Sequence, residues 1–339
     1  MLWTDVIDPA DLTGYARESL NDYEARQGSL ARWLPNREVQ DVVARFVAGG
    51  AGLVEEARYR AYDAEPEVGR TPGRKRVTIE LPAVSQEIPV TEYQQLRERG
   101  ASDEAIRNAI LRTTDSVVRA IADRTERTRG VVLNTGKATV NQSNYAIDDD
   151  FGRDAALTFT APALWSNSAT DAYGQLMTWL DLYVVRAGAL PGAILMSNRA
   201  LRALGATAGM ATQLVSGSSR PATLAEVNAT VQGAGLPEIY LYNRRTSAGP
   251  VIPDTQVLLL PAPVDVNDAE GTELGATFWG RTLTSSDPAF GIESVDEQPG
   301  IVAGVWRNPK PPMIAEVIGD SINLPVLANA NLSMSVKVL

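Results

Sequence analysis

The stretch Arg124–Val140, RTERTRGVVLNTGKATV, joins the end of a long helical pattern to a strand-like one. Within it, residues 130–138 superficially suggest a phosphate-binding loop. That loop needs a glycine where Val131 stands, a Ser or Thr in place of Ala138, and a strand rather than a helix before it. We therefore expect a helix-ending turn at Gly136 and no nucleotide site.

Residues 102–129, before this turn, predict a long helix. Ser102 and Asp103 supply its polar start. Apolar residues then recur on one face at helical spacing: Ile106, Ile110, Val117 and Ile121. Two acid–arginine pairs stand four residues apart on the other face: Asp115–Arg119 and Asp123–Arg127. At ~1.5 Å per residue this helix spans about 40 Å, which suits a spine laid across a flat domain.

Residues 1–50 have the features of an arm, because short amphipathic pieces alternate with prolines and glycines. Trp3 and Trp33 are its apolar anchors. The segment is too short to build its own core, so both rings must bury against the body of the chain or against a neighbour.

Residues 51–92 predict an extended hairpin. Leu53–Asp63 and Arg76–Leu81 show partly alternating strand-type patterns, and the segment between them is rich in Pro and Gly. Four basic residues lie at its tip: Arg70, Arg74, Lys75 and Arg76. An isolated two-stranded ribbon is marginally stable in water, so we expect these residues to meet a partner surface. An ordinary solvated loop remains the alternative.

The rest of the chain predicts a mixture of helices and strands, and the fold class is therefore α+β. A helix is expected at about 170–187, followed by an α/β stretch over 190–265. From Gly275 onward the pattern is mostly strands, placed at 276–281, 301–306, 313–318 and 332–339. These late strands form too small a layer alone, so we expect them to pair with elements before residue 190.

The composition excludes several classes of enzyme. The 339 residues include no cysteine and no histidine, which removes disulfides, thiolate nucleophiles, imidazole bases and nitrogen- or sulfur-ligated metal sites. Asp148–Asp150 could bind a hard cation, but Gly152 breaks the EF-hand pattern and a solvated acidic turn fits better. We identify no catalytic residue, no metal ligand and no cofactor site.

The charge and hydropathy patterns limit the partners. The net charge is −10, from 41 acidic against 31 basic residues, which opposes tight binding to a phosphate backbone. No apolar run approaches the roughly 20 residues that span a membrane. The N-terminus shows no basic-then-apolar secretory pattern. We expect a protein that is made and folded in a cytoplasm, with no membrane contact.

Residues 124–140 resemble the signature at the end of the long helix in the lambda-type major capsid proteins of tailed phages. The matching residues are Glu126, Leu133, Thr135, Gly136, Lys137 and Val140. The next segment, Tyr145–Asp154 (YAIDDDFGRD), resembles the strand-to-Asp-Phe-Gly segment of the family, and Pro191–Ser197 follows in the family's order. The resemblance covers most of the chain, and it implies structural roles for Glu126, Gly136 and Lys137.

The resemblance implies the tailed-phage major capsid (Johnson-type) fold. It assigns residues 1–50 to an N-terminal arm and 51–92 to a hairpin called the E-loop. A peripheral domain would take residues 93–189 and 266–339, and an axial domain would take 190–265. Trp3, Trp33 and the basic hairpin tip are then the expected contacts between copies.

The implied function is that of a structural subunit and not an enzyme. Many copies of the chain would assemble as hexamers and pentamers into an icosahedral head. The head would enclose double-stranded DNA without sequence-specific binding, and scaffold, portal and decoration proteins would be further partners. An encapsulin-like bacterial compartment shell is one alternative, and a cytosolic α/β enzyme is another.

Overall fold

The long helix is α3 (Asp103–Thr135) in the computed structural model, which describes residues 6–48, 75–97, 100, 102–142, 145–210, 221–266, 272–290, 292, 294, 297–307 and 310–339. Ser102 caps its start, and Gly136 ends it with a left-handed φ of 75°. The turn predicted at Gly136 is confirmed. The helix continues past residue 129 because Val132 and Leu133 extend its buried face.

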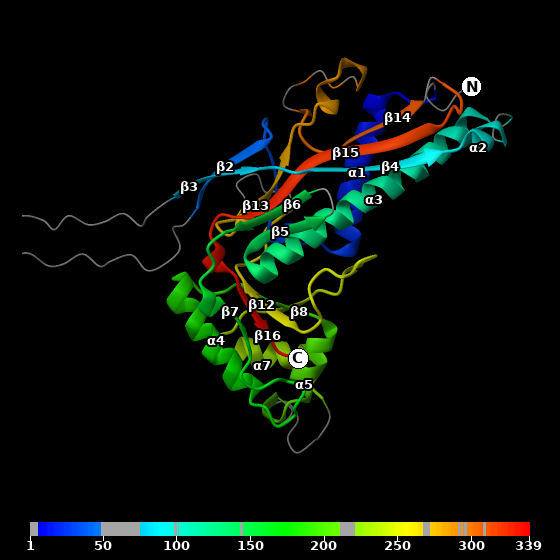
Figure 1. The fold of residues 1–339 in the computed structure, drawn as a ribbon. Helices are drawn as coiled ribbons and strands as arrows, with labels where there is room; N and C mark the ends of the chain where they lie inside the picture. Colours follow the sequence, from blue (N-terminus) through cyan, green and yellow to red (C-terminus); the bar gives the residue numbers. More distant parts are fainter. Residues whose placement is uncertain are drawn as a thin grey trace, which may run out of the picture.

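An upper sheet packs against α3 and lies above it in Figure 1, and its central strand is β15, with 13 residues. Its strands are β1 (Asn36–Glu38), β13 (Gly275–Gly280), β15 (Ala315–Leu327), β14 (Val302–Arg307) and β4 (Ala83–Val90). Both β4 and β1 precede residue 190, so the late strands do pair with earlier elements.

Strand β15 is much longer than the predicted strand at 313–318, because Gly319 does not break it. A Cβ atom on Gly319 would lie 2.6 Å from Val117 Cγ1 of α3, so the missing side chain lets the helix approach the sheet. The predicted strand ends just before this glycine, yet the strand continues through it and its backbone packs directly against α3.

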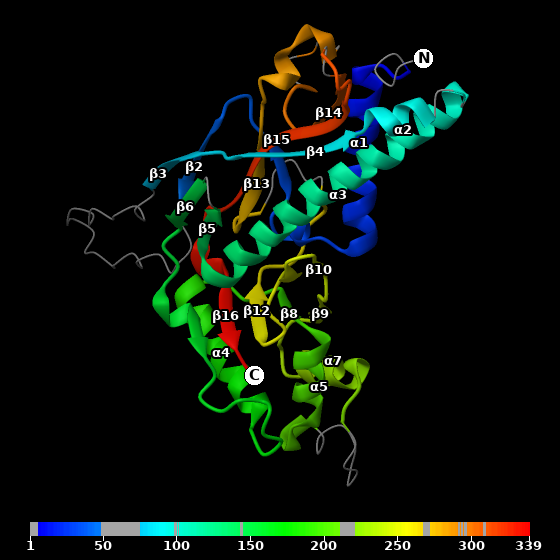
Figure 2. The ribbon, with the colours of Figure 1, turned by 45° about the vertical axis from the view of Figure 1, so that its right-hand side comes forward.

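A lower sheet carries the predicted α/β stretch, flanked by helices as Figure 2 shows. Its order is β7 (Thr158–Thr160), β16 (Met334–Lys337), β12 (Gln256–Leu260), β8 (Ala193–Met196) and β9 (Ile239–Leu241). The flanking helices are α4 (Ala172–Ala187), α5 (Asn198–Ala206) and α7 (Leu224–Gly233). After β15 the chain passes from the upper sheet to β16 of the lower sheet. There the buried strand β12 pairs with β16 on one edge and with β8 on the other.

Two-stranded ribbons extend from these layers. One ribbon pairs β2 (Val43–Ala48) with β3 (Lys75–Glu80), and Phe46 of β2 stacks on Phe278 of the upper sheet. The others are β5 (Lys137–Gln142) with β6 (Tyr145–Asp150) and β10 (Arg245–Thr246) with β11 (Gly249–Pro250). The hairpin thus begins at residue 43, whereas residues 83–90 of the predicted hairpin belong to the upper sheet as β4.

The N-terminal segment packs on the chain's own body. Helix α1 (Pro9–Gln27) lies along α3 and buries Leu12 and Ala16 completely. Tyr15 and Ser19 of α1 donate to Asp115, and Tyr23 donates to Asp123. The acid–arginine pairs expected on an exposed face of α3 are therefore not formed, because these acids bond to α1. A short helix α2 (Glu92–Arg97) precedes α3.

Candidate functional site

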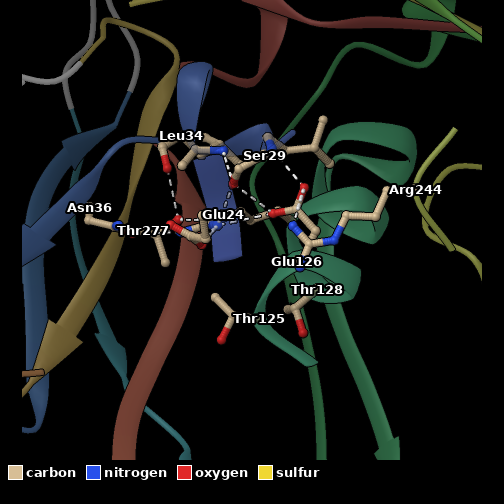
Figure 3. Close-up of polar contacts among 12 residues, drawn as sticks. Glu24, Ser29, Leu34, Asn36, Thr125, Glu126, Thr128, Arg244 and Thr277 are labelled. Atoms are coloured by element: carbon tan, nitrogen blue, oxygen red, sulfur yellow. Dashed lines mark hydrogen bonds and ion pairs between the residues drawn. The ribbon is translucent and has the colours of Figure 1, made fainter. Parts of the chain in front are cut away.

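Glu126 is the centre of a buried polar network, shown in Figure 3. Its Oε1 accepts hydrogen bonds from the Leu30 N–H at 2.7 Å and the Tyr242 hydroxyl at 2.5 Å. Its Oε2 accepts from the Ser29 hydroxyl and Arg129 Nη1, each at 3.0 Å. A fully buried carboxylate with four donors is satisfied, so it stabilises the segments that supply them.

Arg129, one turn later on α3, supplies the opposite charge. Its Nη1 also contacts Glu24 Oε1 of α1 at 2.5 Å, its Nη2 donates to Asn36 Oδ1 at 2.6 Å, and its Nε donates to Thr277 at 2.9 Å. Burial alone would lower the pKa of Arg129, but the Glu24 and Glu126 carboxylates outweigh it and raise the pKa. The guanidinium therefore stays charged inside the core.

Arg244 closes the network from the lower layer. Its Nη2 donates to Asp123 at 3.1 Å, its Nη1 lies 3.8 Å from Glu126 Oε1, and its guanidinium stacks 4.9 Å above the Tyr23 ring. Both Arg244 and Tyr242 follow strand β9 of the lower sheet. The network, which we call the junction, therefore connects the N-terminal segment, the long helix and both sheets.

The sequence pattern contained one signal for the junction. Positions 118, 122, 125 and 129 fall on one stripe of α3 at helical spacing, and that stripe is buried. A charged residue such as Arg129 on a buried stripe needs a partner. Glu126 lies three residues before Arg129 on the same helix, but the other partners lie about a hundred or more residues away in the chain, and no local pattern points to them.

Gly136 and Lys137 form a separate structure at the end of α3. The side chain of Arg153 covers the helix end and donates to the carbonyls of Leu133 and Asn134 at 2.5 and 3.0 Å. A Cβ on Gly136 would lie 2.9 Å from Arg153. Lys137 Nζ forms an exposed ion pair with Asp150 Oδ2 at 2.8 Å across the β5–β6 ribbon.

The acidic run Asp148–Asp150 belongs to strand β6 and not to a turn. Asp148 accepts from the Thr139 hydroxyl, and Asp150 accepts from the Gly152 N–H besides pairing with Lys137. Within the described ranges, no three His, Cys, Asp or Glu side chains converge in a way that could hold a metal ion. Among the same residues, every helix is too short or too polar to serve as a membrane span.

Trp33 lies inside the chain's own core, which corrects the expectation of a contact to another copy. Its ring is 3% exposed and packs edge-on against Tyr240, and its Nε1 donates to the Pro261 carbonyl. The segment after α1 folds back onto the lower sheet, so the ring needs no neighbour.

The other expected contact residues are not described by the structure. Trp3, Arg70 and Arg74 lie outside the described residues, as does the predicted strand Leu53–Asp63. Lys75 and Arg76 begin β3, where their backbones pair with Ala48 and Val47, but their side chains lie outside the description.

Solved structures share this architecture along nearly the whole chain. A protein assigned as the capsid protein of a prophage in E. coli CFT073 has a TM-score of 0.58 and 14% identity, covering 96% of this chain and 99% of that one. A phage-related protein from Bordetella bronchiseptica RB50 has a TM-score of 0.57 and 14% identity, covering 97% and 96%. The capsid of a native GTA particle has a TM-score of 0.51 and 13% identity, covering 91% and 89%.

These likenesses confirm the α+β fold of tailed-phage capsid proteins. No curated protein sequence matches the chain. A family model described as phage major capsid protein E matches residues 34–274, which is well over half of the 339 residues. The match includes the junction residues of α3 and the Gly136–Lys137 turn. The chain belongs to the phage major capsid protein E family.

Proposed function

We propose that this chain is the structural shell subunit of the icosahedral head of a tailed double-stranded DNA phage. Many copies assemble as hexamers and pentamers around the genome, without sequence-specific contact to DNA and without catalysis. The family match over residues 34–274 is the observation that carries the proposal. The mature location is the virion, after synthesis and assembly in the cytoplasm of the bacterial host. Scaffold, portal and decoration proteins are the further partners that we propose.

The distribution of exposed apolar side chains supports assembly through several neighbours. Tyr93 and Leu96 of α2 are 76% and 58% exposed at one end of the upper layer. Val185 and Leu190, at the end of α4 in the lower layer, are 64% and 69% exposed. A standard interface buries ~1,600 Å² in total, and a subunit that engages several neighbours gains cooperative closure.

The junction supports the same proposal, because closed shells need subunits of fixed shape. In this proposal the upper layer is the peripheral domain and the β2–β3 ribbon is the base of the E-loop. The lower layer is the axial domain, which then takes not only residues 190–265 but also β7, α4 and β16 from the ranges 93–189 and 266–339 expected for the peripheral domain. Glu126 and Arg129 hold the two layers and the N-terminal segment in one arrangement.

The first experiment measures particle size. We expect the chain, expressed in a bacterial host, to form closed shells in light scattering and negative-stain microscopy. Shells from infected cells should contain nuclease-protected DNA. A stable monomer at all concentrations, or a shell that carries an enzyme as cargo and no DNA, would contradict the proposal.

The second experiment tests the basic hairpin tip. Substitution of Arg70, Arg74, Lys75 and Arg76 by Glu should block shell formation, because the tip meets acidic surface on a neighbouring copy in this proposal. The variant should still show the circular dichroism spectrum of the folded monomer. Normal shells from this variant would discard the contact while leaving the shell function intact.

A further inference from the structure

Arg124 and Arg127 lie one turn apart on α3 and lack an acidic partner among the described residues. Within the part of the chain that the structure describes, the Arg127 guanidinium donates only to the neutral Thr246 hydroxyl, at 3.4 Å. The adjacent acids are bonded elsewhere, since Asp123 binds Arg244 and Tyr23, and Glu126 belongs to the junction. Two positive charges therefore stand together without compensation.

Their partial burial makes this arrangement unfavourable without a ligand. Both side chains are half-buried. Burial lowers the pKa of Arg124, and the neighbouring charge of Arg127 lowers it further. Like charges three residues apart on a helix also repel. A bound anion would remove both costs, because it pairs with both guanidinium groups at once.

The space for such an anion is present. The two arginines line a cavity of about 180 Å³ together with Thr128, Thr139 and Asn141. Its far wall is strand β5, which lies beside the C-terminal part of α3 in Figure 2. The Thr139 hydroxyl already donates to Asp148 and the Thr128 hydroxyl to the Arg124 carbonyl, so the guanidinium groups and the Asn141 amide are the donors that remain. The planar donor edge of a guanidinium matches the paired oxygens of an oxyanion.

We propose that Arg124 and Arg127 form a binding site for a phosphate-class oxyanion, supplied as free phosphate or by the phosphate of a nucleic-acid backbone. The site does not depend on the proposed shell function. A single site is also compatible with the net charge of −10, which opposes an extended grip on DNA but not one local contact.

The test is thermal unfolding of the full-length chain during a phosphate titration at constant ionic strength, balanced with chloride. We expect the melting temperature of the natural chain to rise by about 2–4 °C and then to saturate. Arg124→Gln and Arg127→Gln should each abolish the rise, and without phosphate each should melt no lower than the natural chain because the repulsion is gone. Arg112→Gln removes the same charge from an exposed position on α3 and should keep the full response.

An equal, unsaturated rise in all four proteins would overturn the site, because it would show only the general stabilisation by excluded salts. A short DNA duplex then separates the two sources. Binding of the duplex that requires both arginines and is displaced by phosphate supports a backbone ligand. Saturable phosphate binding without duplex binding supports free phosphate. Absence of both arginine-dependent effects would overturn the proposal.

Discussion

Two ion pairs lie near the end of α3, and one of them is buried whereas the other is exposed to solvent. Glu126 and Arg129 are 0% exposed and contact each other at 3.0 Å inside the junction. Lys137 and Asp150 contact each other at 2.8 Å, with side chains 43% and 54% exposed. Both pairs include residues that match the capsid signature, yet only the first pair lacks water to replace a lost partner. A matched motif therefore says nothing about the energetic weight of its residues.

Loss of the buried cation should have the largest effect. Arg129→Met leaves the Glu24 and Glu126 carboxylates buried without their shared counter-charge. We expect the free energy of unfolding in urea to fall by about 3–5 kcal/mol. A loss below ~1 kcal/mol would mean that the junction contributes no more than a surface pair.

A second substitution provides the control for this variant. Adding Glu24→Gln to Arg129→Met removes one of the two unpaired charges, so part of the lost stability should return. If the double variant were as unstable as the sum of the two single variants, the residues would not be coupled, and the network would not act as one unit.

The Tyr242 hydroxyl should give the next largest effect and a pH signature. Tyr242→Phe removes a hydrogen bond to a charged carboxylate and should cost about 1.5–3 kcal/mol near neutral pH. Burial raises the pKa of Tyr242 above its ordinary value of 10.0, and Glu126 raises it further. The unfolded chain therefore loses this proton first, so the contribution of the hydroxyl is complete below pH 10 and declines above it.

The measurement is urea unfolding of both proteins at several pH values on each side of 10. The free energies of the natural chain and of Tyr242→Phe should converge as the pH rises beyond the ordinary tyrosine value. Other tyrosines titrate equally in both proteins and cancel. A difference that stays constant with pH would show that the hydroxyl does not bond to Glu126.

Substitution of the glycine that ends α3 should have an intermediate effect on stability. Gly136→Ala places a side chain at a φ of 75° and a Cβ 2.9 Å from Arg153, so we expect a loss of about 1–2 kcal/mol. Gly14→Ala is the matched control, because Gly14 is exposed within α1 and has open space around it. Thermal unfolding should show Gly14→Ala to be slightly more stable than the natural chain. Equal effects of the two substitutions would remove the special role of the turn.

Local signals in the sequence predicted many elements correctly. Ser102 caps the start of α3, Gly136 ends it in a left-handed conformation, and α4 (Ala172–Ala187) lies where the helix at about 170–187 was expected. Each of these depends on residues within one or two turns of each other. The capsid signature, likewise, is contained in one short segment.

Long-range packing accounts for what the sequence could not predict. Asp115 fits an exposed i,i+4 pair by its spacing, but α1 covers it with two hydroxyl donors. Trp33 is as consistent with an outward anchor as with a core residue until the path of the chain is known. In the junction only Glu126 and Arg129 are neighbours on one helix, and their other partners lie about a hundred or more positions away, so the geometry of the network follows from the fold.

Substitution of Lys137 should have the smallest effect on stability, and it tests the comparison between the buried and the exposed ion pair most directly. Lys137→Met removes the exposed ion pair with Asp150, and water solvates both carboxylate oxygens once the ammonium group is gone. The hydrogen bond from Lys137 lowers the pKa of Asp150, as does the Gly152 N–H bond, so any contribution of the pair should be present near neutral pH and vanish as the carboxylate is protonated in acid. We expect no measurable change in unfolding free energy near neutral pH, in high salt or in low.

If Lys137→Met instead destabilised the monomer as strongly as Arg129→Met, burial would not be what separates the two pairs. If it left the monomer unchanged but prevented shell formation, the signature lysine would act between copies.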